Sequence, residues 1–216
     1  MVDIRKNYIS EEDEGILRSE VVLSYDSVIS AKADVSLSIG DTVDTLGFES
    51  EGDKGGATYL VVVGGTGTND GILFIDMDNG NQLQRQKIPE QVFDSVSDAT
   101  SAIWIGIGDA VSVLGHYSPN DGGSADYIAV AGGTGTDDGG SYHDMANGNQ
   151  LELLLEGEVT PLVFGARGDG VSDDTSAIQA TLNYVKKPNT TNIVDFDGRH
   201  YRKADTSPTL IVTGKQ

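Results

Sequence analysis

Apolar and polar residues alternate in short runs along most of this chain, which is the pattern of half-buried β-strands. Two such runs contain the apolar triplets Val35, Leu37, Ile39 and Ile103, Ile105, Ile107. Further strands are predicted at residues 41–48, 59–63, 81–84, 109–117 and 149–152. The dipeptides Asn79-Gly80 and Asn147-Gly148 are typical of β-hairpin turns. The pattern therefore predicts a mainly β protein.

Helices are predicted at three places. Two short ones follow Asp26 and Asp94, which are suitable N-cap residues. A longer one has Ile178, Leu182 and Val185 on one face at the helical spacing, with Asp173 or Asp174 as its N-cap. We expect a short strand at residues 163–165 just before it. After it come a strand around residues 193–196, a turn at Asp197-Gly198 and another strand.

One segment of the chain is written twice. A shift of 68 positions pairs residues 39–84 with residues 107–152 without a gap, and 26 of the 46 pairs are identical. An uninterrupted match indicates the same small fold made twice, in tandem rather than as a solenoid. The expected organisation is an N-terminal arm (1–24), a first repeat (25–92), a second repeat (93–160) and a C-terminal segment (161–216).

Composition and charge restrict the kinds of partner that the chain can bind. Net charge is −20, and residues 88–166 hold twelve Asp and Glu but no Lys or Arg. Such a surface repels nucleic acid and anionic membranes, so neither is an expected partner. No run of 18 apolar residues is present, and there is no cysteine for a disulfide or a thiolate metal site. A unit as short as one repeat is near the lower limit for a core of its own, which favours oligomerisation.

The N-terminal arm, residues 1–24, lies outside the repeat and allows two interpretations. Its apolar residues are too few for a core, and they flank an acidic cluster at residues 11–14. The arm is either a frayed terminus or a segment that orders on a partner protein. In the second case the partner-binding residues would be Ile4, Tyr8, Ile9, Ile16 and Leu17.

A resemblance enters with residues 164–182, FGARGDGVSDDTSAIQATL. This stretch resembles the motif with which right-handed parallel β-helices of the pectate-lyase-like class begin, a motif common in bacteriophage tailspikes. The resemblance implies that the helix covers the open end of a β-helix, and that the strand after it starts the first coil. Asp173, Asp174, Ile178 and Leu182 would then belong to this structural cap.

The repeats are similar to the same setting. Residues 108–130 and 137–154, GDAVSVLGHYSPNDGGSADYIAV and DDGGSYHDMANGNQLELL, resemble the N-terminal virion-attachment region of tailspikes. The first repeat departs from that pattern at GFESEGDKGG, and His116 replaces a usual aromatic residue. The resemblance implies a homotrimer in the virion tail that binds tail, baseplate or adaptor proteins. The function it implies is a structural anchor for a receptor-binding or glycan-degrading body.

Catalytic chemistry has little support in the residues. Glycoside hydrolysis needs two carboxylates facing one sugar, and the residues after Val185 suffice for about one β-helix coil. We therefore expect no catalytic residues, no cofactor and no metal site. His116 and His143 align with Phe48 and Ile75, which indicates packing positions. Two alternatives stay open: a glycan depolymerase, hydrolase or lyase, whose catalytic β-helix is absent, and a pair of carbohydrate-binding β modules.

Overall fold

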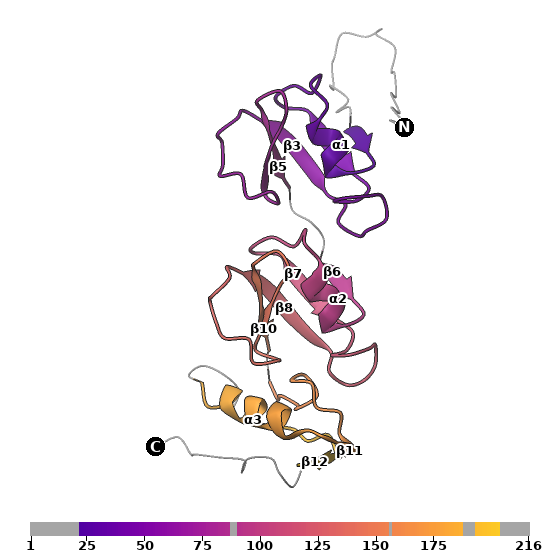
Figure 1. The fold of residues 1–216 in the computed structure, drawn as a ribbon, viewed down its shortest axis with the longest axis vertical. Coiled ribbons are helices and arrows are strands. Elements are labelled where there is room, and N and C mark those ends of the chain that lie inside the picture. The colour runs from indigo at the N-terminus through magenta and orange to yellow at the C-terminus, as the bar shows by residue number, and fades with distance from the viewer. Residues whose placement is uncertain (1–21, 87–89, 156, 188–192, 204–216) are drawn as a thin grey trace, which may run out of the picture. The chain divides into compact units, whose positions relative to one another are not determined.

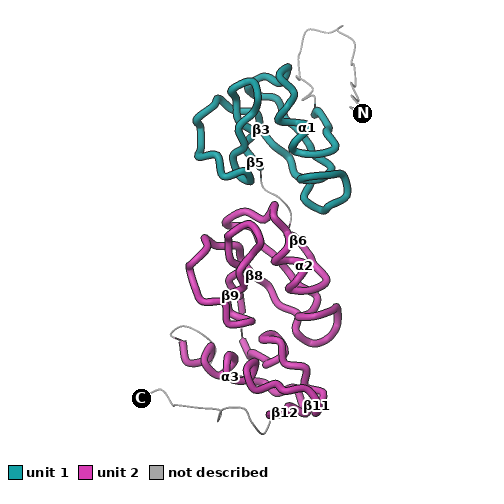
Figure 2. Tube along the Cα trace, viewed as in Figure 1, with its two compact units in different colours: residues 1–89 teal, residues 90–216 magenta. Residues whose placement is uncertain are grey.

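The structure is a computed structural model that describes residues 22–86, 90–155, 157–187 and 193–203. The chain divides into two compact units, residues 1–89 and 90–216, which Figure 2 distinguishes by colour. The protein is mainly β with a few short helices. Within the described ranges, no helix is both long enough and apolar enough to cross a membrane.

Unit 1 is a single five-stranded sheet with one helix (Figure 1). Its elements are β1 (Val22–Tyr25), α1 (Val28–Lys32), β2 (Thr42–Thr45), β3 (Thr58–Val62), β4 (Phe74–Asp76) and β5 (Gln82–Arg85). The sheet order is β1-β2-β3-β5-β4, with β1 parallel to β2 and every other pair antiparallel. Residues 22–24, expected in the arm, therefore lie in the first strand of this sheet.

Unit 2 repeats this arrangement and then continues. Its elements are β6 (Gln91–Phe93), α2 (Val96–Ser101), β7 (Ala110–Val113), β8 (Ala125–Val130), β9 (Tyr142–Asp144), β10 (Gln150–Leu154), β11 (Asp169–Asp173), α3 (Thr175–Tyr184) and β12 (His200–Arg202). The order β6-β7-β8-β10-β9 matches that of the first sheet, and β11 pairs with β12 in parallel. Each of the two hairpins β4–β5 and β9–β10 turns at a glycine with positive φ, Gly80 and Gly148, as predicted.

The core of unit 1 lies between the sheet and α1. Alternate residues of the strands point into it, because successive side chains of a strand face opposite sides of the sheet. Each fully buried side chain of this kind contributes roughly 1.5–3 kcal/mol. The residues that form this core are Tyr25, Val28, Ala31, Leu37, Val43, Tyr59, Val61, Ile75, Met77 and Leu83.

The core of unit 2 extends past the sheet. It contains the matching residues of the second copy, such as Phe93, Tyr127 and Leu151, and also residues from the end of the chain. The added residues are Val159, Val163, Phe164, Ala166, Ala177 and Tyr184. The second sheet and the segment that follows it therefore fold around one continuous core.

The strands predicted at residues 35–39 and 103–107 are wrong, because both stretches form turns. Leu37 and Ile105 are buried, while Ile39 and Ile107 are 61% and 52% exposed. The cause is the turn that follows, in which Gly40 and Gly108 have φ values of 95° and 92°. Alternation over so short a run of apolar residues cannot distinguish a strand from consecutive turns that bury one side chain.

The predicted N-caps of the two short helices are also wrong by one position. Ser27 and Ser95 are the N-caps, and their hydroxyl oxygens accept hydrogen bonds from the backbone N–H of Ser30 and Asp98. Asp26 and Asp94 lie one position earlier. A serine hydroxyl satisfies a free N–H of the first turn as well as a carboxylate does, so residue type alone could not choose between the neighbours.

Around α3 the predictions are confirmed in part. The helix and the turn at Asp197-Gly198 are present. The predicted strand at residues 163–165 is wrong, because residues 161–165 form turns in which Gly165 has a φ of 83°. The strand expected around residues 193–196 is reduced to one parallel bridge, between Val194 and Val159.

Candidate functional site: the junction between the second sheet and residues 159–187

Two loops of the second copy form a surface on which the following segment of the chain packs. We call this surface the acceptor face and define it by His116, Tyr117, Gly122, Gly140 and Ser141. We call residues 159–187, which contact it and complete the core, the entry segment. Both belong to unit 2.

The first loop of the acceptor face is held by one carboxylate. Asp121 accepts hydrogen bonds from the backbone N–H groups of four residues, His116, Tyr117, Ser118 and Gly123. Burial by itself would raise the pKa of Asp121, but these four donors lower it below its usual value. In the first copy Asp53 binds four backbone N–H groups in the same way. The two copies therefore share this loop frame.

Polar contacts join this loop to the entry segment. The Tyr117 hydroxyl donates to the Gly165 carbonyl oxygen at 2.8 Å, and His116 Nδ1 lies 3.0 Å from the Val163 carbonyl oxygen. The Arg167 guanidinium lies over the Tyr117 ring, 4.2 Å from its centroid, where a cation is attracted by the ring face. These contacts satisfy the backbone of the turn that precedes β11.

The Phe164 ring occupies a space that is open because Gly140 has no side chain. A Cβ atom at Gly140 would lie 2.2 Å from a ring carbon of Phe164, which is far inside van der Waals contact. On its other side the Phe164 ring packs on Tyr184 of α3, with centroids 5.6 Å apart. Gly165 also needs to be glycine, because a Cβ there would be strained at positive φ and would lie 2.8 Å from His116 Nε2.

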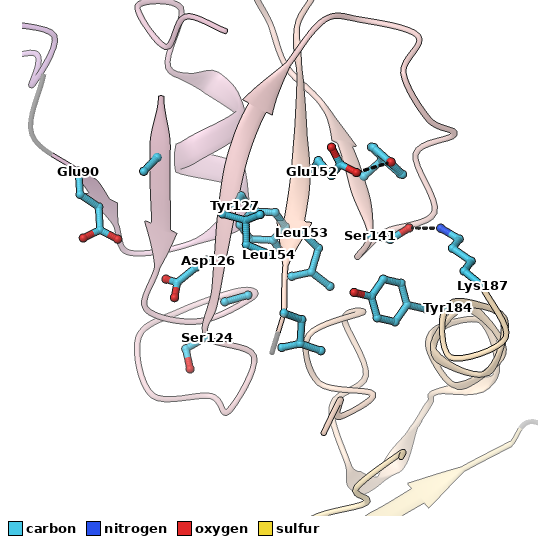
Figure 3. A pocket seen from close by; sticks show the side chains of 14 residues that line it. Glu90, Ser124, Asp126, Tyr127, Ser141, Glu152, Leu153, Leu154, Tyr184 and Lys187 are labelled. Atoms are coloured by element: carbon cyan, nitrogen blue, oxygen red, sulfur yellow. Dashed lines mark hydrogen bonds between the residues drawn. The ribbon is translucent and has the colours of Figure 1, made fainter. Parts of the chain in front are cut away.

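The turn that follows α3 closes the junction on a second side. Lys187 Nζ lies 2.9 Å from Ser141 Oγ and 3.8 Å from Asp138 Oδ2. Beside it runs an open groove of about 940 Å³, which reaches from Glu90 across β8 and β10 to Tyr184 and Lys187 (Figure 3). Within this groove the Tyr142 hydroxyl donates to Glu152, 2.7 Å away.

The two histidines of the second copy pack against other side chains, as expected from their alignment with Phe48 and Ile75; His116 belongs to the acceptor face, and His143 is buried next to it. His143 is 5% exposed, with its ring 5.5 Å from that of Tyr127 and 6.1 Å from that of His116. Burial lowers the pKa of His143 to about 4, against the smaller raising effect of Asp137. Burial also lowers the pKa of His116. Burial thus favours the neutral form of both rings.

The residues expected in the structural cap lie at or beside α3. Asp174 stands at the N-cap, yet its carboxylate accepts from the backbone N–H of Arg167 and Arg202 and not from α3. Asp173 accepts from Thr175, at the first position of the helix. Ile178 is buried and Leu182 half-buried. The helix face that enters the common core carries Ala177 and Tyr184, which the apolar spacing did not single out.

The proposed partner-binding residues Ile4, Tyr8, Ile9, Ile16 and Leu17 lie outside the described residues. In the part of the chain that the structure describes, no group of His, Cys, Asp or Glu has the geometry to hold a metal ion.

Sequence reasoning did not identify the acceptor face. A signal was present, because residues 140–143 (GSYH) differ at all four positions from residues 72–75 (ILFI) within an otherwise well-matched repeat.

Comparisons with known proteins add partial likenesses. No family model and no curated protein matches the chain. Among solved structures it is similar to tailspike protein 2 of an Escherichia coli O157:H7 bacteriophage, at 26% identity and a TM-score of 0.38, over 44% of this chain and 12% of that chain. For Pantoea stewartii WceF, a glycan biofilm modifying enzyme with a tailspike-like parallel β-helix fold, the values are 16%, 0.42, 64% and 19%. For the tailspike gp49 of Acinetobacter baumannii bacteriophage Fri1, a capsular polysaccharide depolymerase, they are 22%, 0.40, 44% and 18%.

The structural neighbours are thus phage tailspikes and a β-helix glycan-modifying enzyme. This chain spans less than a fifth of the length of each of the three. TM-scores between 0.38 and 0.42 mark a limited likeness, so the function has to be argued from the residues of this chain.

Proposed function

We propose that this chain is the N-terminal anchor of a phage tailspike, a structural component of the virion tail. It joins a receptor-binding or glycan-degrading body, which would follow α3, to tail, baseplate or adaptor proteins. In this proposal the spike is a homotrimer, and this part of it does no catalysis. The observation that carries the proposal is the continuous core shared by the second sheet and the entry segment.

A shared core suits an anchor because it transmits position. Segments joined only by a flexible linker reorient freely, whereas segments packed in one core move together. Here Phe164 and Tyr184 of the entry segment are buried in the same cluster as Tyr127 and Leu151 of the sheet. A body that continues from the entry segment would be held in a fixed orientation relative to the second copy.

The strand pairing after the second sheet supports a parallel β-helix as the body that follows. Val159 pairs in parallel with Val194, and Asp169 pairs in parallel with His200, so at both places the chain returns alongside itself in the same direction. Parallel pairing after one turn of chain is the step that a parallel β-helix repeats. The helix α3 lies between the paired segments, and the resemblance of residues 164–182 to the β-helix entry motif implies a capping helix at this point of the chain.

The attachment role is tested with particles of the phage that encodes the chain, assembled without their own spike. A fluorescent protein fused after Gln216 should be incorporated into these particles, and deletion of residues 1–24 should abolish incorporation. The arm is the expected contact because it occurs once per chain, while the repeats occur twice.

A deletion of residues 1–21 is the matched control for damage to the first sheet, because it leaves β1 intact. Normal incorporation of both deletion variants would place the docking surface elsewhere in the chain. Failure of the undeleted fusion to enter particles would contradict the anchor role. A separate assay incubates the purified chain with the host's capsule or lipopolysaccharide and measures viscosity and reducing ends. Cleavage in this assay would instead favour a hydrolase or lyase.

A further inference from the structure

Several residues with which the second copy contacts the entry segment differ from their counterparts in the first copy, although Asp138 is matched by Asp70. The five residues of the acceptor face, His116, Tyr117, Gly122, Gly140 and Ser141, correspond to Phe48, Glu49, Lys54, Ile72 and Leu73 in the first copy. None of the five pairs is identical, although 26 of the 46 aligned pairs are. The residues that shape the loops are kept, including Asp53 and Asp121.

Steric fit accounts for two of the five differences. A Cβ at Gly140 would lie 2.2 Å from the Phe164 ring, and one at Gly122 would lie 2.6 Å from Leu162 Cδ1. The first copy has Ile72 and Lys54 at these positions, and Lys54 keeps the positive φ of the turn, at 71°. The backbone is thus the same kind of turn in both copies, while the space that the entry segment needs is filled in the first.

Polar chemistry accounts for the other three. Tyr117 donates to the Gly165 carbonyl oxygen, and Ser141 Oγ accepts from the Lys187 ammonium. Glu49 has no hydroxyl to donate to that carbonyl, and Leu73 has no oxygen to accept from that ammonium. His116 can hydrogen-bond the Val163 carbonyl through Nδ1, which Phe48 cannot do. Docked on the first copy, the entry segment would lose these three hydrogen bonds.

We infer that these five exchanges make the second copy, and not the first, the acceptor of the entry segment. The inference rests on the proposed function only in using the entry segment as the start of the body. Two tandem copies this similar are prone to pairing with the wrong neighbour during folding. Specificity of this kind needs an element that rejects the wrong partner as well as one that binds the right one. In the first copy Ile72 and Lys54 exclude the entry segment, and in the second copy the acceptor face binds it.

A matching groove remains on the first copy. It has a volume of about 310 Å³ and is lined in part by Phe48, Glu49, Gly71 and Ile75. Their counterparts in the second copy are His116, Tyr117, Gly139 and His143, three of which lie against the entry segment or under it. The groove of the first copy thus lies at positions whose counterparts in the second copy face the entry segment.

The test exchanges side chains within the full chain. An acceptor-loss variant carries H116F, Y117E, G122K, G140I and S141L, so that the second copy has the first copy's residues. Hydrogen exchange of the amides of α3 should become roughly 100-fold faster or more, because the helix loses the surface that holds it. The amides of β8 and β10 should keep their protection. The control variant carries F48H, E49Y, K54G, I72G and L73S in the first copy and should leave α3 protection unchanged.

Retained protection of α3 in the acceptor-loss variant would overturn the inference, whether the segment stays on the second copy or moves to the first. If the five changes unfold the second sheet, the single variants G140I and Y117F decide. Faster exchange confined to the entry segment supports the inference, and unchanged exchange in both contradicts it. Incorporation into particles is a separate readout, so the anchor role can fail while the acceptor inference holds.

Discussion

At the scale of single residues, matching positions of the two copies carry different chemistry in the same surroundings. Ile75 in β4 and His143 in β9 are both buried, 6% and 5% exposed. The isoleucine has no charge to desolvate. The histidine can carry a charge, and burial disfavours that charge. Burial therefore lowers the pKa of His143 to about 4, while the unfolded chain keeps a value near 6.5. The second copy therefore contains an ionisable group that the first lacks.

This difference predicts a pH dependence for unit 2. Between pH 6.5 and about 4 the unfolded state binds a proton at His143 that the folded state does not, so the free energy of unfolding falls as the pH falls through this window. The contribution is at most about 3 kcal/mol, from roughly 1.36 kcal/mol per pKa unit. It is fully present above pH 6.5. Thermal unfolding of the wild type at pH 7.5 and pH 4.5 measures it.

The H143I variant is the matched control, because the first copy already has isoleucine there. Carboxylates such as Asp121, whose pKa is lowered in the fold, also destabilise the protein in acid, but they do so equally in both proteins. The pH dependence should therefore be weaker in H143I. An equal dependence in both proteins would show that His143 is not protonated on unfolding.

At the scale of elements, short polar motifs decide where the helices begin. α1 and α2 have five and six residues, too few to be stable alone in water. Their first turns are secured by the hydroxyl groups of Ser27 and Ser95, and α2 adds a hydrogen bond from the Ser95 hydroxyl to Asp98, at 2.8 Å. The remaining stability comes from packing, because Val96 and Ala99 are buried against the sheet.

The S95A variant should lower the free energy of unfolding of unit 2 by about 1 kcal/mol, the usual cost of removing an N-cap. D94A, one position earlier, should change it by less than about 0.5 kcal/mol. Denaturant unfolding followed by circular dichroism compares the two. A larger loss in D94A than in S95A would place the N-cap at the aspartate.

At the scale of the whole molecule, small units and high charge bear on assembly. Each copy has one short helix over five strands, and the chain carries a net charge of −20. Units as small as a single repeat bury little surface alone, so further burial between chains would stabilise them. Net charge of this size opposes nonspecific association, and an oligomer would then depend on specific, complementary surfaces.

We expect the purified chain to be a homotrimer. Light scattering at micromolar concentration should give three times the chain mass of 22.7 kDa, and dilution should lower the melting temperature because association stabilises the folded state. The acceptor-loss variant is a useful comparison, since it separates trimerisation through the repeats from trimerisation through the entry segment. A monomer with a concentration-independent melting temperature would rule out the trimer for this chain.

Features that depend on residues close together in the chain could be predicted from the sequence. The repeat, the hairpins at Gly80 and Gly148, and α3 after Asp174 are set by turn glycines and apolar spacing, which act over a few positions. Features that depend on contacts between distant residues became visible only in the folded chain. Residues 35–39 form turns and not a strand, because the core takes up only one of their apolar side chains, that of Leu37, and Ile39 stays exposed. Phe164 completes the core of the second sheet because Gly140, well before it in the chain, leaves it room, and a contact between positions so far apart is invisible to local pattern.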